Sequence, residues 1–168
     1  MHATRWSTLA APASNRGANR SAPVLAGGLV AGALDITYAC IFWGLKRGVP
    51  AERIFQSVAA GLLGEASFRG GAGTAALGLF LHFLIATTMS LVYYLVARRW
   101  AALWERPLLC GAGYGLLLYA IMNYVVVPLS AAGPQSKDPL WIGLSVAVHA
   151  LLIGVPIALF TRRALRPL

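Results

Sequence analysis

The sequence predicts an all-helical protein: a four-helix transmembrane bundle with a short amphipathic interfacial or re-entrant helix between spans one and two. The first observation is composition. The 168 residues are 58% hydrophobic and only 11% charged, whereas a soluble domain carries about 25% charged residues. The second is the presence of four apolar windows, each long enough to cross the roughly 30 Å of bilayer hydrocarbon. The third is that basic residues lie almost wholly between these windows.

The four windows are predicted to be helical because lipid offers a peptide backbone no hydrogen-bond partner. They cover residues 23–45, 74–97, 107–129 and 140–161. Aromatic and basic side chains prefer the membrane interface. Such residues mark the window ends as expected: Trp43, Arg98, Arg99, Trp100, Trp141, Arg162 and Arg163.

The connection between the first two windows contains the predicted interfacial helix, at about residues 50–67. Pro50 suits the start of a helix. Four apolar side chains recur near helical spacing: Ile54, Phe55, Val58 and Leu62. They define a face that would lie on the membrane or inside the bundle. The polar side chains of Glu52, Arg53 and Gln56 lie off this face. The remaining segments are a flexible basic N-terminal tail at 1–22 and a basic C-terminal end at 162–168, which flank a membrane domain at 23–161.

The net charge of +9 does not indicate nucleic-acid binding, because the basic residues flank apolar windows instead of forming one polar face. We interpret them as anchors that contact the bilayer and its anionic headgroups. Nine Lys and Arg lie on the side that holds both termini, and five lie on the other side. Cytoplasmic loops carry the excess of these residues, so both termini are predicted to be cytoplasmic.

Each window carries one strongly polar residue at a similar depth. Asp35, His82, Asn123 and His149 lie roughly 18–24 Å from the predicted cytoplasmic ends, at about 1.5 Å of rise per residue. An aspartate at the centre of a span costs about 2.5–3.5 kcal/mol on insertion scales. The coincidence of depth predicts one intramembrane polar layer that offsets this cost.

The direction of each polar residue follows from its neighbours. Asp35 shares a helix stripe with Gly28 and Gly32, and Tyr38 follows about one turn later. Small residues mark close helix–helix faces in membranes, so Asp35 is predicted to face neighbouring helices. Equivalent stripes carry the other three polar residues. Asp35 would then be charged and paired with a protonated histidine, or neutral and hydrogen-bonded.

Three classes of function fit this layer. In the leading hypothesis the protein is a small transporter or proton-handling permease that uses the polar cluster Asp35, His82, Asn123, His149 and Tyr38. In the alternative it is a structural or accessory subunit in which these groups only hold helices together. In the third, His82 and His149 bind haem or a metal. The sequence carries no Walker loop, GxSxG elbow, HExxH or Rossmann fingerprint, so it does not favour an enzyme, and it identifies no cofactor.

Two further features bear on cysteine chemistry and assembly. Cys40 and Cys110 lie inside apolar windows without metal-site spacing, so we expect both to behave as small hydrophobic side chains. The stretch "GGLVAG" has the small-xxx-small pattern of helix packing. It would support a homo-oligomer or a partner membrane subunit unless the same face packs within the chain.

Three stretches resemble small four-span bacterial inner-membrane proteins of uncharacterised function, the YagU-like proteins: "ERIFQSVAAGLLGEASFRGG", "ALGLFLHFLIA" and "LCGAGYGLLLYAIMNYVVVPLSA". The resemblance covers roughly residues 24–160. It implies a multi-pass helical protein of the bacterial inner membrane, and it implies no activity.

Overall fold

The computed structural model describes residues 20–166. Within that range the chain is all-helical, and four helices are long and apolar enough to cross a membrane: α1 (Ser21–Arg47), α3 (Gly71–Ala97), Pro107–Leu129 and Pro139–Leu165. Each contains its predicted window. Ser21 and Ala22, predicted to belong to the tail, are the first residues of α1. The predicted tail at 1–19 and the last two residues lie outside the described range.

Two shorter helices bring the total to six in the described part of the chain. α2 (Ala51–Leu63) lies in the predicted interfacial segment and is followed by a 3-10 turn, η1 (Gly64–Arg69). α4 (Ala102–Glu105) was not predicted. It ends one residue before Arg106, because a residue that directly precedes a proline, here Pro107, rarely adopts the helical conformation. The Tyr93 hydroxyl donates to the Leu103 carbonyl at 2.8 Å and holds α4 against α3.

The third and fourth spans are each interrupted by a π-helical segment. α5 (Pro107–Ile121) passes through η2 (Met122–Val126) into α6 (Val127–Leu129). α7 (Pro139–Val148) passes through η3 (His149–Gly154) into α8 (Val155–Leu165). Pro128 and Pro156 follow these segments. Because proline lacks an N–H and its ring clashes with the preceding turn, it perturbs the helix on its N-terminal side, and π segments occur at such points.

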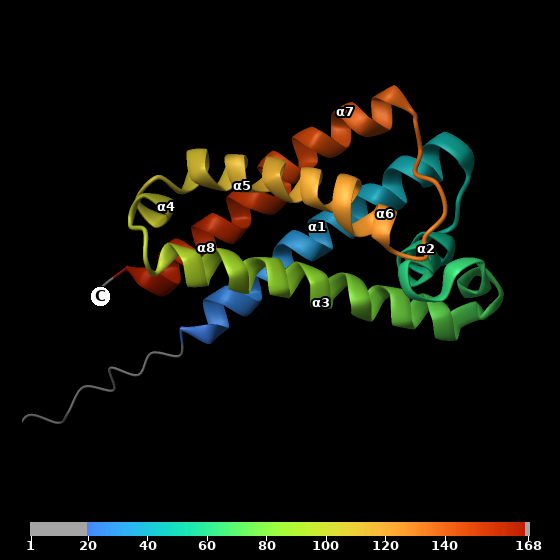
Figure 1. Cartoon of the computed structure of the whole chain (residues 1–168), viewed down its shortest axis with the longest axis horizontal. Coiled ribbons are helices and arrows are strands. Elements are labelled where there is room, and N and C mark those ends of the chain that lie inside the picture. Colours follow the sequence, from blue (N-terminus) through green and yellow to red (C-terminus); the bar gives the residue numbers. More distant parts are fainter. Residues whose placement is uncertain (1–19, 167–168) are drawn as a thin grey trace, which may run out of the picture.

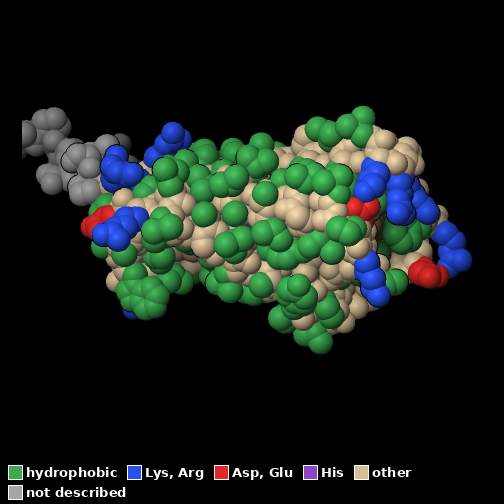
Figure 2. Space-filling model, turned by 90° about the horizontal axis from the view of Figure 1, so that it is seen from above, with side chains coloured by type: hydrophobic (Ala, Val, Ile, Leu, Met, Phe, Trp, Pro, Cys, Tyr) green, Lys and Arg blue, Asp and Glu red, His purple; other side chains and the backbone are tan. Residues whose placement is uncertain are grey.

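The two ends of the bundle hold different elements. Figure 1 shows the start of α1, the end of α8 and α4 at one end, with α2, η1 and the connection before α7 at the other. Figure 2 shows Lys and Arg gathered at both ends of the visible face, with apolar and uncharged atoms between them. Large apolar side chains are exposed on all four spans, including Leu25, Phe80, Leu109 and Leu151. Such a surface suits acyl chains better than water.

Close contact between α1 and α3 depends on glycine. A Cβ on Gly28 would lie 2.5 Å from the Thr87 Cα, and one on Gly32 would lie 3.0 Å from the Ala86 Cβ. The Ser90 hydroxyl adds a hydrogen bond of 2.7 Å to the Val24 carbonyl. The small-residue stripe of "GGLVAG" therefore packs within the chain, which removes the basis on which this stripe was expected to form an oligomer.

α2 packs tightly on α3, and its buried face matches the predicted face only in part, since Ile54 is buried while two other residues differ from the prediction. A Cβ on Gly78 would lie 1.8 Å from the Phe55 carbonyl oxygen, so the two backbones nearly touch. Gln56, predicted to lie off the apolar face, is 2% exposed and donates to the Gly71 carbonyl at 3.1 Å. Leu62, predicted on the apolar face, is 64% exposed. The small buried side chains of Ala59 and Ala60 allow this close approach of α2 to α3.

The two halves of the bundle differ in packing. The half nearest the termini contains buried core residues from α3, α5 and α8, which include Tyr93, Ala97, Leu118, Ile157 and Ala158, and this core reaches the cavity at Ala31 of α1. The half nearest α2 contains a cavity, and the predicted polar residues lie there.

Candidate functional site

The cavity has a volume of about 370 Å³ and is lined by all four spans, by α2 and by the connection after α6. On α1 its lining runs from Ala31 to Trp43, a distance of about 18 Å along the helix. Asp35, His82, Asn123 and His149 all line it. The structure thus brings together, around one cavity, the polar residue that the sequence shows in each span.

The two imidazoles donate to backbone carbonyls. His82 Nε2 lies 2.8 Å from the Gly32 oxygen of α1, and His149 Nδ1 lies 2.9 Å from the Ser145 oxygen one turn earlier. A carbonyl oxygen only accepts, so the facing ring nitrogen carries the proton in each case. In the neutral rings His82 Nδ1 and His149 Nε2 are then hydrogen-bond acceptors.

Two of the four residues lie where a span changes from α- to π-helix. Asn123 is in η2, and its amide nitrogen donates to the Tyr119 carbonyl at 2.9 Å. His149 is the first residue of η3, and its bond to Ser145 has the same four-residue spacing. Gln135 donates to the Asn123 carbonyl at 2.8 Å. These bonds tie the Asn123 and His149 side chains to the backbone of their own spans at the start of the π segments, which gives both residues a structural role.

Asp35 differs from the other three. Across residues 20–166 its carboxylate forms no ion pair or hydrogen bond with either imidazole, so the predicted pairing is absent. One nitrogen of each ring bonds a backbone carbonyl, and the other nitrogen forms no bond with Asp35 in the described structure. Asp35 is partly exposed and lines the cavity. It is therefore a carboxyl group inside a candidate span that forms no hydrogen bond or ion pair with either histidine.

Tyr38 does not contact Asp35 through a hydrogen bond in the described structure, and it is not among the residues that line the cavity. It lies beside the cavity, with its hydroxyl 3.3 Å from Ser145 Oγ and its ring stacked on Trp141 at 5.2 Å between centroids. Phe42 and Trp43 also pack on Trp141, at 5.0 and 5.2 Å. We call Tyr38, Phe42, Trp43 and Trp141 the aromatic cluster.

Trp43 and Trp141, predicted as interface anchors, both line the cavity. The sequence does contain one signal for the aromatic cluster: Tyr38 and Phe42 are four residues apart on α1, and such residues share a helix face. The approach of α7 to that face is a tertiary contact that the spacing alone does not contain.

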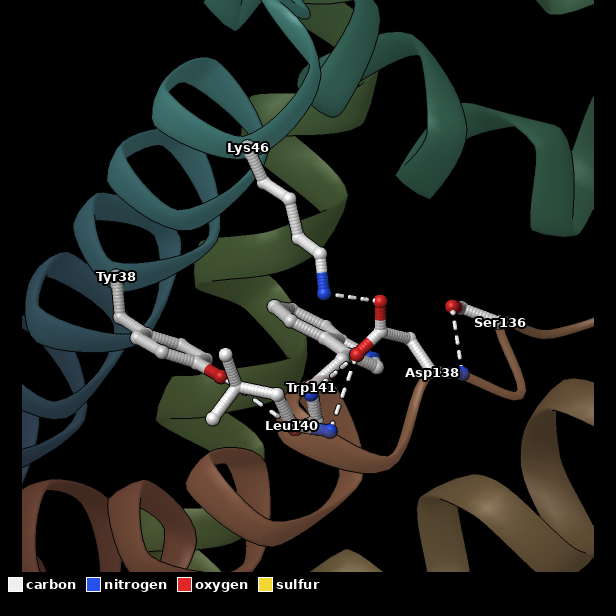
Figure 3. Close-up of polar contacts among 6 residues, drawn as sticks. All are labelled: Tyr38, Lys46, Ser136, Asp138, Leu140 and Trp141. Carbon is white, nitrogen blue, oxygen red and sulfur yellow. Dashed lines mark hydrogen bonds and ion pairs between the residues drawn. The ribbon is translucent and has the colours of Figure 1, made fainter.

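An ion pair between α1 and α7 stands next to the aromatic cluster. The Lys46 ammonium contacts the Asp138 carboxylate, which also accepts from the backbone N–H groups of Leu140 and Trp141 at 3.0 and 3.2 Å (Figure 3). Asp138 is thus the N-cap of α7. The hydrogen bond from Lys46, reinforced by the bond from Trp141, holds the pKa of the Asp138 carboxyl below its ordinary value of 3.8.

The lowered pKa gives a testable pH dependence. A carboxyl whose pKa is lower when folded stabilises the folded state at pH values above its ordinary pKa, and this contribution disappears as the pH falls through the lowered value. We expect Asp138→Asn to have a lower Tm than the parent protein at pH 7, with the difference shrinking below about pH 3.8. Thermal unfolding of both proteins at pH 7 and pH 3 tests this. A difference that grows on acidification would contradict it.

The hypothesis that the protein binds haem or a metal requires side chains placed as ligands. Among residues 20–166 no group of three His, Cys, Asp or Glu side chains is placed to hold a metal ion. Two histidines from different helices can still ligate a haem, so that hypothesis stays a prediction, and the visible spectrum of the purified protein tests it through a Soret band.

The fold and the site together define a class: a chain with four candidate membrane spans around a largely apolar cavity that carries one strongly polar residue from each span. No protein family, curated protein or solved structure matches the chain. Only the geometry of the cavity therefore bears on function.

Proposed function

We propose that this protein is a multi-pass protein of the bacterial inner membrane that acts as a small transporter or proton-handling permease, with its solute or protons passing through the cavity. The observation that carries this proposal is the Asp35 carboxylate, which lines a cavity of about 370 Å³ inside a candidate span. Ionisable residues within spans commonly mark solute and proton paths.

A structural role explains three of the four polar residues better than it explains Asp35. His82 bonds α3 to α1, while Asn123 and His149 bond the backbone at the π segments. A residue that only holds helices together needs a partner on a neighbouring helix. Asp35 lines open volume instead, and an aspartate in this position costs about 2.5–3.5 kcal/mol. A function in the cavity gives a reason to retain it.

Substitution of Asp35 tests the proposal. We expect Asp35→Asn to keep the folded protein at parental abundance, because the side chain keeps its shape, and to abolish proton or solute flux in reconstituted vesicles together with any growth or pH phenotype. Glu65→Gln is the control, since Glu65 is an exposed carboxylate outside the cavity lining. Parental flux in Asp35→Asn would refute the proposal.

The second candidate is a structural or accessory membrane subunit, favoured by the interhelical bond from His82 to the Gly32 carbonyl. His82→Ala separates the two. The structural role would be supported if His82→Ala yielded no folded protein while Asp35→Asn kept parental flux. Retained abundance with lost flux would place His82 in the transport path.

We further propose that both termini are cytoplasmic and that the basic ends contact anionic headgroups. The end of α3, α4 and the end of α8 lie at the same end of the bundle as the start of α1 (Figure 1). Arg98 and Arg106 directly follow α3 and α4, and Arg162 and Arg163 lie in the last turn of α8. Alkaline phosphatase fused after Leu168 is expected to be inactive, and a fluorescent protein at the same point is expected to fold. The opposite pair of results would reverse the assigned orientation.

A further inference from the structure

The charge of the cavity is set by one residue. Among the described residues that line it, Asp35 is the sole Asp, Glu, Lys or Arg. Two basic residues of α1 lie near the cavity but do not line it. Lys46 is committed to Asp138 and lies over the Phe42 ring, 5.3 Å from its centroid, and Arg47 lies over the Trp43 ring at 5.4 Å. In a low-dielectric surrounding an uncompensated carboxylate strongly favours a positive partner.

Several hydrogen-bond donors on the lining are occupied by backbone carbonyls. The Ser57 and Ser130 hydroxyls each donate to a carbonyl of their own helix at 2.7 Å. The imidazoles of His82 and His149 also donate to carbonyls, which leaves an accepting nitrogen on each neutral ring. The indole N–H groups of Trp43 and Trp141 form no hydrogen bond within the described structure and remain donors. The lining therefore disfavours anions through the Asp35 carboxylate and not through a lack of donors.

The remaining surface suits apolar groups that bear a positive charge. Trp43 and Trp141 contribute indole rings, and Met89 and Met122 contribute thioethers. Tryptophan faces attract cations more strongly than other aromatic rings do, and methionine adapts to irregular apolar shapes. The volume of about 370 Å³ falls in the range of roughly 300–1,000 Å³ found for small-molecule sites.

We propose that the cavity binds a lipophilic organic cation, an amine or quaternary ammonium ion, with its charge near Asp35 and its apolar groups against Trp43 and Trp141. This inference rests on the proposed function and names the substrate class for the same cavity. Asp35 supplies the counter-charge and disfavours anions, and the two indoles supply the aromatic wall.

The test uses three probes of similar size and different charge: benzyltrimethylammonium, its neutral carbon isostere neopentylbenzene, and benzenesulfonate. Binding to the purified full chain in detergent is measured by calorimetry against detergent alone. We expect the cation to bind at least tenfold more tightly than the isostere, and the anion not to bind. The permanent charge of benzyltrimethylammonium keeps probe protonation out of the comparison.

Variants locate the site. Asp35→Asn is expected to weaken binding of the cation at least tenfold and to leave binding of the isostere unchanged. Trp141→Leu is expected to weaken binding of the cation more than binding of the isostere, because the cation–π contribution is lost. Glu65→Gln, which removes an exposed carboxylate outside the lining, is the matched control and should bind the cation as the parent protein does.

Equal affinity for the cation and its isostere would overturn the inference, as would an Asp35→Asn variant that binds the cation normally. The comparison of probes on the parent protein decides the question even if a variant fails to fold. If Asp35→Asn loses proton flux while the parent binds no cation, the substrate class is wrong and the proposed function stands. If the parent binds the cation but Asp35→Asn keeps flux, the substrate class stands and the proposed function fails.

Discussion

Replacing Gly115 by alanine is expected to prevent the protein from reaching its folded state. Gly115 lies where α5 crosses η3, and an added Cβ would be 1.9 Å from the His149 carbonyl oxygen and 2.8 Å from the Ala150 Cα. Both obstacles are backbone, so they can clear only if the two spans separate. Overpacking of a fitted core typically costs about 1–3 kcal/mol and sometimes more, and we expect the upper end here.

The measurement is the yield of monodisperse protein after detergent extraction, together with its Tm. Gly113→Ala is a close control, because a Cβ at Gly113 meets nothing within 4 Å on the same helix. Alanine has the higher helix propensity, so that control should be unchanged or slightly more stable. A Gly115→Ala protein with parental yield and Tm would show that the described crossing is wrong.

Replacing Gly78 by alanine is expected to release α2 from α3 while the four spans stay assembled. The added Cβ would be 1.8 Å from the Phe55 carbonyl oxygen, again a backbone atom. α2 lies outside the spans, so its displacement should not separate them. The local cost should be at least about 1–3 kcal/mol, which is enough to populate a detached α2.

Hydrogen exchange read by mass spectrometry distinguishes local from global loss. In Gly78→Ala we expect faster exchange in residues 51–63 and parental exchange in α5. Gly73→Ala is the control, since Gly73 is in the first turn of α3 and a Cβ there meets nothing within 4 Å. Because Ile54, Ser57 and Val58 of α2 line the cavity, the variant should also bind solutes more weakly. Unchanged exchange in 51–63 would contradict the docking of α2.

The spans could be predicted from the sequence because a bilayer imposes one simple requirement, about 20 apolar residues with all backbone groups bonded internally. The depth of Asp35, His82, Asn123 and His149 followed from helical rise alone. These quantities depend on position along a helix, and position is what a sequence records directly. The cavity that all four residues line required only that their faces turn inward.

Contacts that depend on rotation and on close backbone approach could not be predicted. The predicted pairing of Asp35 with a histidine is absent. One nitrogen of His82 and of His149 bonds the carbonyl of Gly32 or Ser145, and the distance from the other nitrogen to Asp35 is set by how the helices cross. Gln56 is buried for the same kind of reason. α2 approaches α3 so closely at Gly78 that the Gln56 side chain reaches the Gly71 carbonyl.

The aromatic cluster was missed because its members are distant in sequence. Trp141 meets Tyr38, Phe42 and Trp43 only after α7 packs beside the end of α1. The π segments were missed too, although Pro128 and Pro156 mark them, since a proline fixes where a helix is perturbed and not which irregular form results.

The two π segments make the bundle mechanically unequal. α1 and α3 are continuous over 27 residues each and are sealed together through glycine contacts. The other two spans are weakened at η2 and η3, at the level of the cavity. We expect the third and fourth spans to bend more readily at these segments than α1 and α3 do, because a π segment interrupts the regular helical ladder. Asp35 lies on a continuous helix, whereas Asn123 and His149 lie at the two points where such bending would occur.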